Sequence, residues 1–354
     1  MDKYIFFVFD YRSLLYALAI IEQLTKIESI EFVVSLEPLS MFIKSLSISN
    51  AKVILSKNDN ICSRNVFKYP LHKRRLKNVY ERTFSHKEGY AVYFFEMGFD
   101  LHLLYFIKRL CRKNSVFYLE YFSYPSTFEL EKSLKINIKH LIYRYIYSLK
   151  VDTYLIRDNS TCVALSPAFL SNNKINIINN KIDLVKVLKK YAVKDSRFES
   201  AKVLFLVVDF VQAGIISQHT SDIFHEKLSS FLSRIFKREE IIVKPHPTFN
   251  MNISPVFQKH AIVDSKIPAE FLFYTGKIKI ILGAGSTSQI SATEMDEVIF
   301  ILLYKLVGFS PIDVASMEKH FCSKEMKECN NLIVPKTWEE LEEVLQRCVL
   351  NELP

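Results

Sequence analysis

Glycine is scarce in this chain, with seven residues among 354. Glycine lets the backbone turn tightly or approach another group closely, so the few positions that hold it are informative. Two of the seven, Gly283 and Gly285, stand within three positions of each other. We therefore expect a tight turn or a close backbone contact at this point.

Cysteine is also sparse and scattered. The six cysteines show no CxxC spacing and no cysteine and histidine spacing typical of zinc sites, so neither a metal centre nor a disulfide framework is expected. A reduced, cytoplasmic setting fits this usage. No run of residues reaches the roughly 18 apolar positions of a membrane span. Met1 leads almost directly into a short apolar run at 5–9, so no signal peptide is expected.

Acidic residues are outnumbered, and the formal net charge is +9. Two stretches, 64–87 and 132–150, carry much of the excess, with lysine and arginine interleaved with aromatic residues. Such stretches suit an anionic membrane surface, an acidic acceptor or nucleic acid, and can also be an ordinary solvated surface. Nucleic acid is the least expected partner, because no helix-turn-helix, zinc or single-strand-binding signature accompanies the charge.

Short apolar runs alternate with helix-length segments along both halves of the chain. This alternation predicts an α/β protein with parallel sheets covered by helices on both faces. The length and a polar stretch at 189–200 predict two domains, residues 1–190 and 201–354. Strands are predicted at 4–9, 30–35, 52–55, 90–95, 116–120, 153–156, 203–208, 278–282 and 298–302, and in the run before His246. Helices are predicted at 13–26, 100–112, 129–149 and 220–236, after Pro268, from Gln289, and after Thr337, which stands at capping-box spacing from Glu340.

The most informative segment is 241–247, an apolar run that ends in Lys244, Pro245, His246 and Pro247. Proline fixes its own φ and favours extended geometry in the residue before it, so Lys244 and His246 are expected at the carboxyl end of a buried strand. Ligands bind at that edge of an open α/β sheet. An imidazole near a lysine suits a phosphate or a leaving group that gains negative charge. The alternative is a structural turn whose histidine caps a carbonyl.

A second strand, at 278–282, runs into Gly283, Ala284, Gly285, Ser286, Thr287 and Ser288. Hydroxyls beside the unpaired N–H groups of a helix start form an anion site, although an ordinary N-cap is the alternative. Two such units about forty residues apart predict two walls of one nucleotide-phosphate pocket.

These motifs resemble those of the bacterial sialyltransferases of glycosyltransferase family 52 and the related bacterial polysialyltransferases. That family carries a His-Pro motif, matched here by His246 and Pro247, and a Ser-Ser or Ser-Thr motif, matched by Ser286 and Thr287. Residues 204–218 resemble the opening strand of its second domain. Residues 267–270, which end at Glu270, resemble its Pro-x-Glu element. The resemblance implies a GT-B fold, with two Rossmann-like domains facing a central cleft.

The family's acidic motif, Asp/Glu-Asp/Glu-Gly, is altered in this chain. Glu120 fits the first acid, whereas Tyr121 and Phe122 replace the second acid and the glycine. The resemblance assigns Glu120 as the general base, and loss of the glycine predicts a different loop shape and acceptor choice. Glu96 and Asp100 are the alternative acids. Glu120 has a structural alternative as a salt-bridged carboxylate at a strand end.

The resemblance implies an inverting transfer of sialic acid, or a related nonulosonic acid, from a CMP-activated donor to a lipooligosaccharide or capsule glycan. Residues 1–190 would bind the glycan or glycolipid acceptor and residues 201–354 the nucleotide sugar. Glu120 would take the acceptor proton, and His246 would stabilise or protonate the departing CMP phosphate. The remaining donor-binding residues implied are Lys244, Pro247, Gly285, Ser286, Thr287 and Glu270, the last at the ribose hydroxyls. No metal or other cofactor is implied, and the enzyme would be cytoplasmic or peripheral at the inner membrane face.

Two other functions fit the same motifs. A teichoic-acid-type glycerophosphotransferase, which uses CDP-glycerol, also has a His-Pro strand end and a later Ser-Ser helix start. A non-catalytic nucleotide- or glycan-binding relative fits the altered motif at 120–122.

Overall fold

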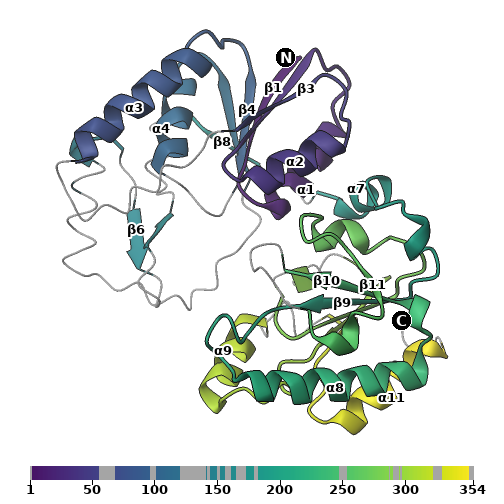
Figure 1. Cartoon of the computed structure of the whole chain (residues 1–354). Coiled ribbons are helices and arrows are strands. Elements are labelled where there is room, and N and C mark those ends of the chain that lie inside the picture. The colour runs from purple at the N-terminus through teal and green to yellow at the C-terminus, as the bar shows by residue number, and fades with distance from the viewer. Residues whose placement is uncertain are drawn as a thin grey trace. The chain divides into compact units, whose positions relative to one another are not determined.

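The computed structural model divides into two compact units, Met1–Ile182 and Asp183–Pro354 (Figure 1). The boundary lies before the predicted end of the first domain at residue 190. The residues it describes are 2–55, 68–95, 101–119, 141, 144–149, 152–155, 161–164, 173–178, 182–246, 253–286, 288–289, 295, 297–321 and 329–350.

A six-stranded parallel sheet forms the centre of the first unit, in the order β3-β2-β1-β4-β5-β8. Its strands are β1 (Lys3–Val8), β2 (Ser29–Val34), β3 (Ala51–Leu55), β4 (Ala91–Phe95), β5 (Ser115–Leu119) and β8 (Asn176–Ile178). The direction of winding reverses between β1 and β4, which is the strand order of Rossmann folds.

Helices cover both faces of this sheet (Figure 1). The helices α1 (Tyr11–Ile21) and α2 (Glu37–Ser45) lie on one face, and α3 (Lys68–Thr83) and α4 (Leu101–Leu110) on the other. Alternate β1 residues such as Phe7 pack in a buried cluster with Phe84 and with Phe106 of α4. Burial of both sheet faces explains why the strands are continuous apolar runs.

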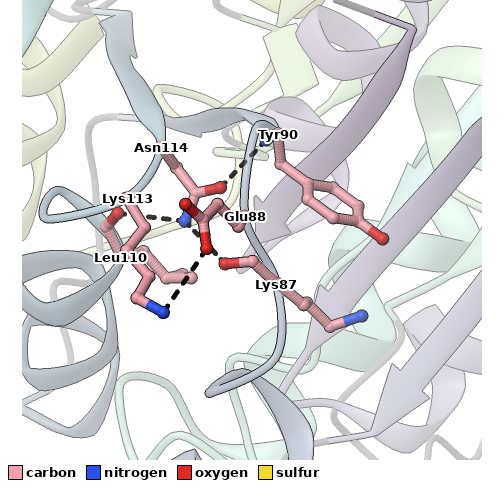
Figure 2. A network of polar contacts seen from close by, with 6 residues as sticks. All are labelled: Lys87, Glu88, Tyr90, Leu110, Lys113 and Asn114. Carbon is pink, nitrogen blue, oxygen red and sulfur yellow. Dashed lines mark hydrogen bonds and ion pairs between the residues drawn. The ribbon is translucent and has the colours of Figure 1, made fainter.

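Polar contacts hold the turn between α4 and β5 (Figure 2). The Asn114 side chain accepts a hydrogen bond from the Tyr90 N–H at 2.9 Å. It also donates to the backbone carbonyls of Leu110 at 3.0 Å and Lys87 at 3.2 Å. Because one side chain satisfies three backbone groups, Asn114 ties the end of α4 to the start of β4.

The strand predicted at 153–156 does not join the parallel sheet. β6 (Asp152–Leu155) pairs antiparallel with β7 (Thr161–Ala164) in a separate two-stranded sheet. A parallel pairing needs a crossover of a dozen or more residues, whereas these two strands are too close in sequence for one. The sixth place in the sheet is occupied by β8, which pairs with β5. Most of the helix predicted at 129–149 lies outside the described residues.

The second unit repeats the same winding, with a parallel sheet in the order β11-β10-β9-β12-β13-β14. Its strands are β9 (Val203–Val207), β10 (Ile241–Pro245), β11 (Ala261–Ile262), β12 (Ile280–Gly283), β13 (Ile299–Leu302) and β14 (Leu332–Ile333). Its α-helices are α7 (Leu184–Lys190), α8 (Gln218–Ile235), α9 (Pro311–Phe321) and α11 (Trp338–Val349). Its 3-10 turns are η1 (Ser196–Phe198), η2 (Arg238–Glu240), η3 (Pro255–Phe257) and η4 (Ala269–Leu272).

Helices α8 and α11 begin at side-chain caps. The Ser217 hydroxyl accepts the Thr220 N–H at 3.1 Å before α8, and the Thr337 hydroxyl accepts the Glu340 N–H at 3.2 Å before α11. The predicted cap at Thr337 is confirmed. Helix α8 then buries Phe224, Leu228 and Leu232, spaced four residues apart, against the sheet.

The polar stretch at 189–200 belongs to the second unit. The Val193 N–H donates to the Phe271 carbonyl at 3.1 Å, and Phe198 is buried. The α/β class, with two parallel sheets of Rossmann order, is confirmed. The GT-B arrangement, in which the two domains face a central cleft, stays a prediction. Across the described part of the chain, no helix combines the length and apolarity needed to cross a membrane.

Candidate functional site

Both sequence motifs of the second half lie at one edge of the second sheet. Lys244 of β10 and Gly283 of β12 are both in register with Leu206 of β9, the strand between them. This shared register sets the two motifs at the same level, on either side of β9. Neighbouring strands lie about 4.8 Å apart, so the two motifs are close together. The two motifs therefore lie at one edge of the sheet, and the phosphate pocket predicted between them stays a prediction.

This edge is also where the winding of the sheet reverses. β9 pairs with β10 on one side and with β12 on the other, and later strands extend the sheet outward from each. Open α/β sheets bind ligands in the crevice at such a reversal. The loop after β12 and the segment from β9 to the N-cap Ser217 of α8 both begin there.

The end of β12 and the loop after it each need a glycine. Gly285 has a φ of 146°, a backbone conformation that L side chains rarely adopt. At Gly283, a Cβ would lie 2.8 Å from the Gln289 Oε1 atom. The predicted close approach is therefore present at Gly283.

Gln289 holds this loop in place, a role that the sequence analysis missed. Its side chain is fully buried, its Oε1 accepts the Ser286 N–H at 3.2 Å, and its Nε2 donates to the Ile301 carbonyl at 3.0 Å. The residue thus links the loop after β12 to β13. Its place six residues after Gly283 gives no signal of this contact in the sequence.

Ser286 is half-buried and caps the backbone that follows it. Its Oγ accepts the Ser288 N–H at 3.4 Å, as expected for the N-cap alternative. A serine hydroxyl that accepts such a bond still has its own proton to donate to an anion. Thr287 lies outside the described residues.

Lys244 is buried, with 3% of its surface exposed. Its ammonium donates to the backbone carbonyls of Pro245 at 2.5 Å and Ser265 at 3.1 Å. Burial lowers its pKa to about 8, and the carboxylates of Glu270 and Asp264 act in the opposite direction. Lys244 is therefore largely protonated at neutral pH, and its ammonium is directed at backbone carbonyls.

His246 follows β10 and is half-buried. Burial lowers the pKa of its imidazole, and the positive charge of Lys244 lowers it further. The side chain is therefore mainly neutral at pH 7 in the free protein, with one nitrogen able to donate a hydrogen bond. Pro247 lies outside the described residues.

Glu270 lies in the 3-10 turn η4, which Pro268 precedes as its N-cap. This single turn stands where the sequence predicted a helix after Pro268. Glu270 is buried, and its charge acts on Lys244. Lys244, His246 and Glu270 thus form one electrostatically coupled group beside β10.

The predicted general base follows a strand of the first sheet. β5 ends at Leu119, so Glu120 is the next residue along the chain, but it lies outside the described residues. The same holds for the alternative acids Glu96 and Asp100, and for Tyr121 and Phe122.

Asp10 is an acid that the sequence analysis did not single out as a site residue. It follows β1 at the winding reversal of the first sheet and is the N-cap of α1, where its Oδ1 accepts the Ser13 N–H at 2.7 Å. Burial raises the pKa of its carboxyl group, and the bonds from Ser13 act in the opposite direction. An apolar run that ends in Asp, with Ser three positions later, is the signal that predicts this cap.

A small cavity lies next to the same edge of the second sheet. Its wall includes Phe210 and Ile216 from the segment after β9, Ala284 from the loop after β12, and Ser221 and His225 of α8. His225 lies 3.3 Å from the Ser221 hydroxyl, and burial lowers the pKa of its imidazole. No group of three or more potential metal-binding side chains occurs among the residues that the structure describes.

Comparison with known proteins gives similarity at the level of structure only. No family model matches the chain, and no curated protein matches its sequence. A crystal structure of a UDP-N-acetylglucosamine 2-epimerase is similar with a TM-score of 0.49 and 11% identity, over 99% of this chain and 88% of that one. The glycotransferase of kitacinnamycin has a TM-score of 0.42 and 7% identity, over 98% and 90% of the two chains. The wall teichoic acid polymerase TagF has a TM-score of 0.49 and 8% identity, over 100% and 81%.

Proposed function

We propose that this chain is a GT-B glycosyltransferase that moves sialic acid, or a related nonulosonic acid, from a CMP-activated donor to a cell-surface glycan. The observation that carries the proposal is the position of His246 and of the Gly285 and Ser286 loop on either side of β9, at the winding reversal of a Rossmann sheet. The resemblance of these motifs to glycosyltransferase family 52 supports the choice of donor.

The donor phosphate would lie between the two loops. Ser286 can donate its hydroxyl proton, and the neutral imidazole of His246 can donate an N–H, to oxygens that gain charge as CMP departs. The Lys244 ammonium is already bonded to backbone carbonyls. It would therefore act on the phosphate through its positive charge and not through a direct hydrogen bond. Pro247 and Thr287 complete the two motifs, and Glu270 would accept hydrogen bonds from the ribose hydroxyls.

The acceptor would be activated from the first unit. Glu120 would take the proton of the acceptor hydroxyl as its oxygen attacks the anomeric carbon from the side opposite the phosphate. The bond between that carbon and the phosphate oxygen breaks, and CMP leaves with the electron pair. The configuration at the anomeric carbon is therefore inverted, and this scheme uses no metal ion.

A glycerophosphotransferase that uses CDP-glycerol is the second candidate. The residues at the sheet edge favour it as well, because His246 and Ser286 would act on a departing CMP in that reaction too. The two candidates differ in the group that is transferred, so they separate when each donor is supplied alone.

The test is CMP release from CMP-sialic acid with a panel of oligosaccharide acceptors, repeated with CDP-glycerol. We expect acceptor-dependent release with the sialic acid donor, lost in Glu120→Gln and in His246→Ala. His219→Ala, which changes an exposed histidine of α8, is the matched control and should keep full activity. Release from CDP-glycerol alone would select the second candidate. CMP binding without turnover of either donor would indicate a binding protein, and no CMP binding would contradict both reactions.

A further inference from the structure

Helix α3 has one side that belongs to the core of the first unit. Tyr69, His72, Leu76 and Tyr80 recur at helical spacing, and His72 and Leu76 are buried. Leu76 belongs to the buried cluster that also contains side chains of α4 and β4, and Tyr69 and Tyr80 pack against that cluster. This contact fixes which side of α3 faces outward.

The outward side is basic and partly apolar. Its exposed residues Leu71, Arg74, Arg75, Asn78 and Arg82, here called the outer stripe, follow the i, i+3, i+4, i+7, i+11 pattern of one helix face. Leu71 is 64% exposed. The stripe contains three arginines and no carboxylate. The one acid of the helix, Glu81, is 3.6 Å from the ammonium of Lys77.

A second exposed segment lies beside α3. The Tyr147 hydroxyl lies 2.7 Å from the His72 Nδ1 atom, and the Tyr147 ring meets the Tyr69 ring edge-on. This anchor holds residues 144–149 beside the first half of α3. Just before it, Tyr145 is 72% exposed and Leu141 is 52% exposed, with the exposed Arg144 between them in sequence.

We propose that the outer stripe of α3, together with Leu141, Arg144 and Tyr145, docks on the surface of an anionic lipid bilayer. Arginines attract anionic headgroups, while exposed leucine and tyrosine side chains enter the boundary between headgroups and acyl chains. Leucines have no favourable partner along a phosphate backbone, which argues against nucleic acid. The surface lies on the first unit, so it does not depend on the chemistry proposed at His246.

The test is binding of the full chain to vesicles of phosphatidylcholine alone and of phosphatidylcholine with phosphatidylglycerol, measured by cosedimentation. The variant Arg74→Gln/Arg75→Gln/Arg82→Gln keeps good helix formers and should weaken binding to the anionic vesicles by about 100-fold. The matched control, Lys186→Gln/Lys194→Gln/Lys277→Gln, removes the same charge from exposed positions of the second unit and should bind like the wild type.

A second variant tests the apolar contribution at constant charge. Leu71→Ser/Tyr145→Ser alters two exposed side chains, so it should keep the circular dichroism spectrum of the wild type and weaken vesicle binding by about fivefold. The proposal would be overturned if the lysine control lost as much vesicle binding as the arginine variant, or if the wild type did not bind anionic vesicles. It would also be overturned if the arginine variant or the Leu71→Ser/Tyr145→Ser variant bound like the wild type. Tighter binding to a single-stranded oligonucleotide than to the vesicles at the same salt concentration would overturn it as well.

Discussion

The Gln289 Oε1 atom lies 2.8 Å from the position that a Cβ of Gly283 would occupy. This contact is possible only because residue 283 has no side chain. It lets a buried amide bond to the Ser286 N–H and to the Ile301 carbonyl together. The side chain of Gln289, six positions after Gly283, therefore holds the backbone of the candidate phosphate loop.

Gly283→Ala should displace Gln289 and break both of its hydrogen bonds. We expect a loss of about 1–3 kcal/mol in the free energy of unfolding, because a buried polar group loses its partners. CMP affinity, measured by calorimetry, should fall with it. Gly89→Ala is the control, since no atom lies within 4 Å of the Gly89 Cβ position and its φ of 75° is the only source of strain there. Equal CMP affinity in the two variants would contradict this role of Gln289.

Lys244→Met should raise the pKa of His246. The positive charge of Lys244 disfavours protonation of the imidazole, so its removal leaves burial as the cause of the remaining depression. An NMR titration of the His246 ring protons measures the change. Lys279→Met, at an exposed position next to β12, serves as the control and should leave that titration unchanged. An unshifted His246 in Lys244→Met would show that the two side chains are not coupled.

Lys244 should also make the free energy of unfolding depend on pH in the alkaline range. Its pKa is lowered from 10.5 to about 8 on folding, so between these values the unfolded chain binds more protons than the folded one. The free energy of unfolding contributed by this residue therefore rises from pH 8 to 10.5, by on the order of 2 kcal/mol. Urea titrations of the wild type and Lys244→Met across this range measure the difference between the two proteins. Parallel pH profiles would contradict the depressed pKa.

Lys87→Met should destabilise the first unit strongly. Lys87 forms an ion pair with Glu31, and both side chains are buried. Without its partner, the Glu31 carboxylate would remain in the core as an uncompensated charge, at a cost of about 3–5 kcal/mol. Denaturant unfolding measures this cost. The double variant Lys87→Met/Glu31→Leu should recover most of the loss, because no charge is then buried.

An exposed ion pair gives the matched comparison for Lys87. Lys113 and Glu88 are 3.5 Å apart at the surface (Figure 2). Lys113→Met should cost less than about 1 kcal/mol, since water already screens that pair. Similar losses in Lys87→Met and Lys113→Met would show that burial of the first pair has no energetic effect.

The sequence by itself determined the local features of the fold. Runs of apolar residues marked most strands of both sheets, because a strand buried on both faces must be apolar throughout. The prolines at 245 and 247 and the glycines at 283 and 285 marked the strand ends, because these residues restrict or free the backbone locally. Helix α3 was missed as a helix. Its few inward apolar positions are interleaved with lysine and arginine, so the basic composition obscured the helical spacing.

Only the tertiary structure decided how these segments combine. The register of β10 and β12 on β9 places the motifs at 244–246 and 283–286 on one edge of the sheet. β6 pairs with β7 in a separate sheet and is not part of the parallel sheet. The burial of Lys244 and the contact between Gln289 and Gly283 were likewise invisible in the sequence. Strand register and side-chain burial depend on contacts between residues far apart along the chain. Local propensity and spacing carry no information about those contacts.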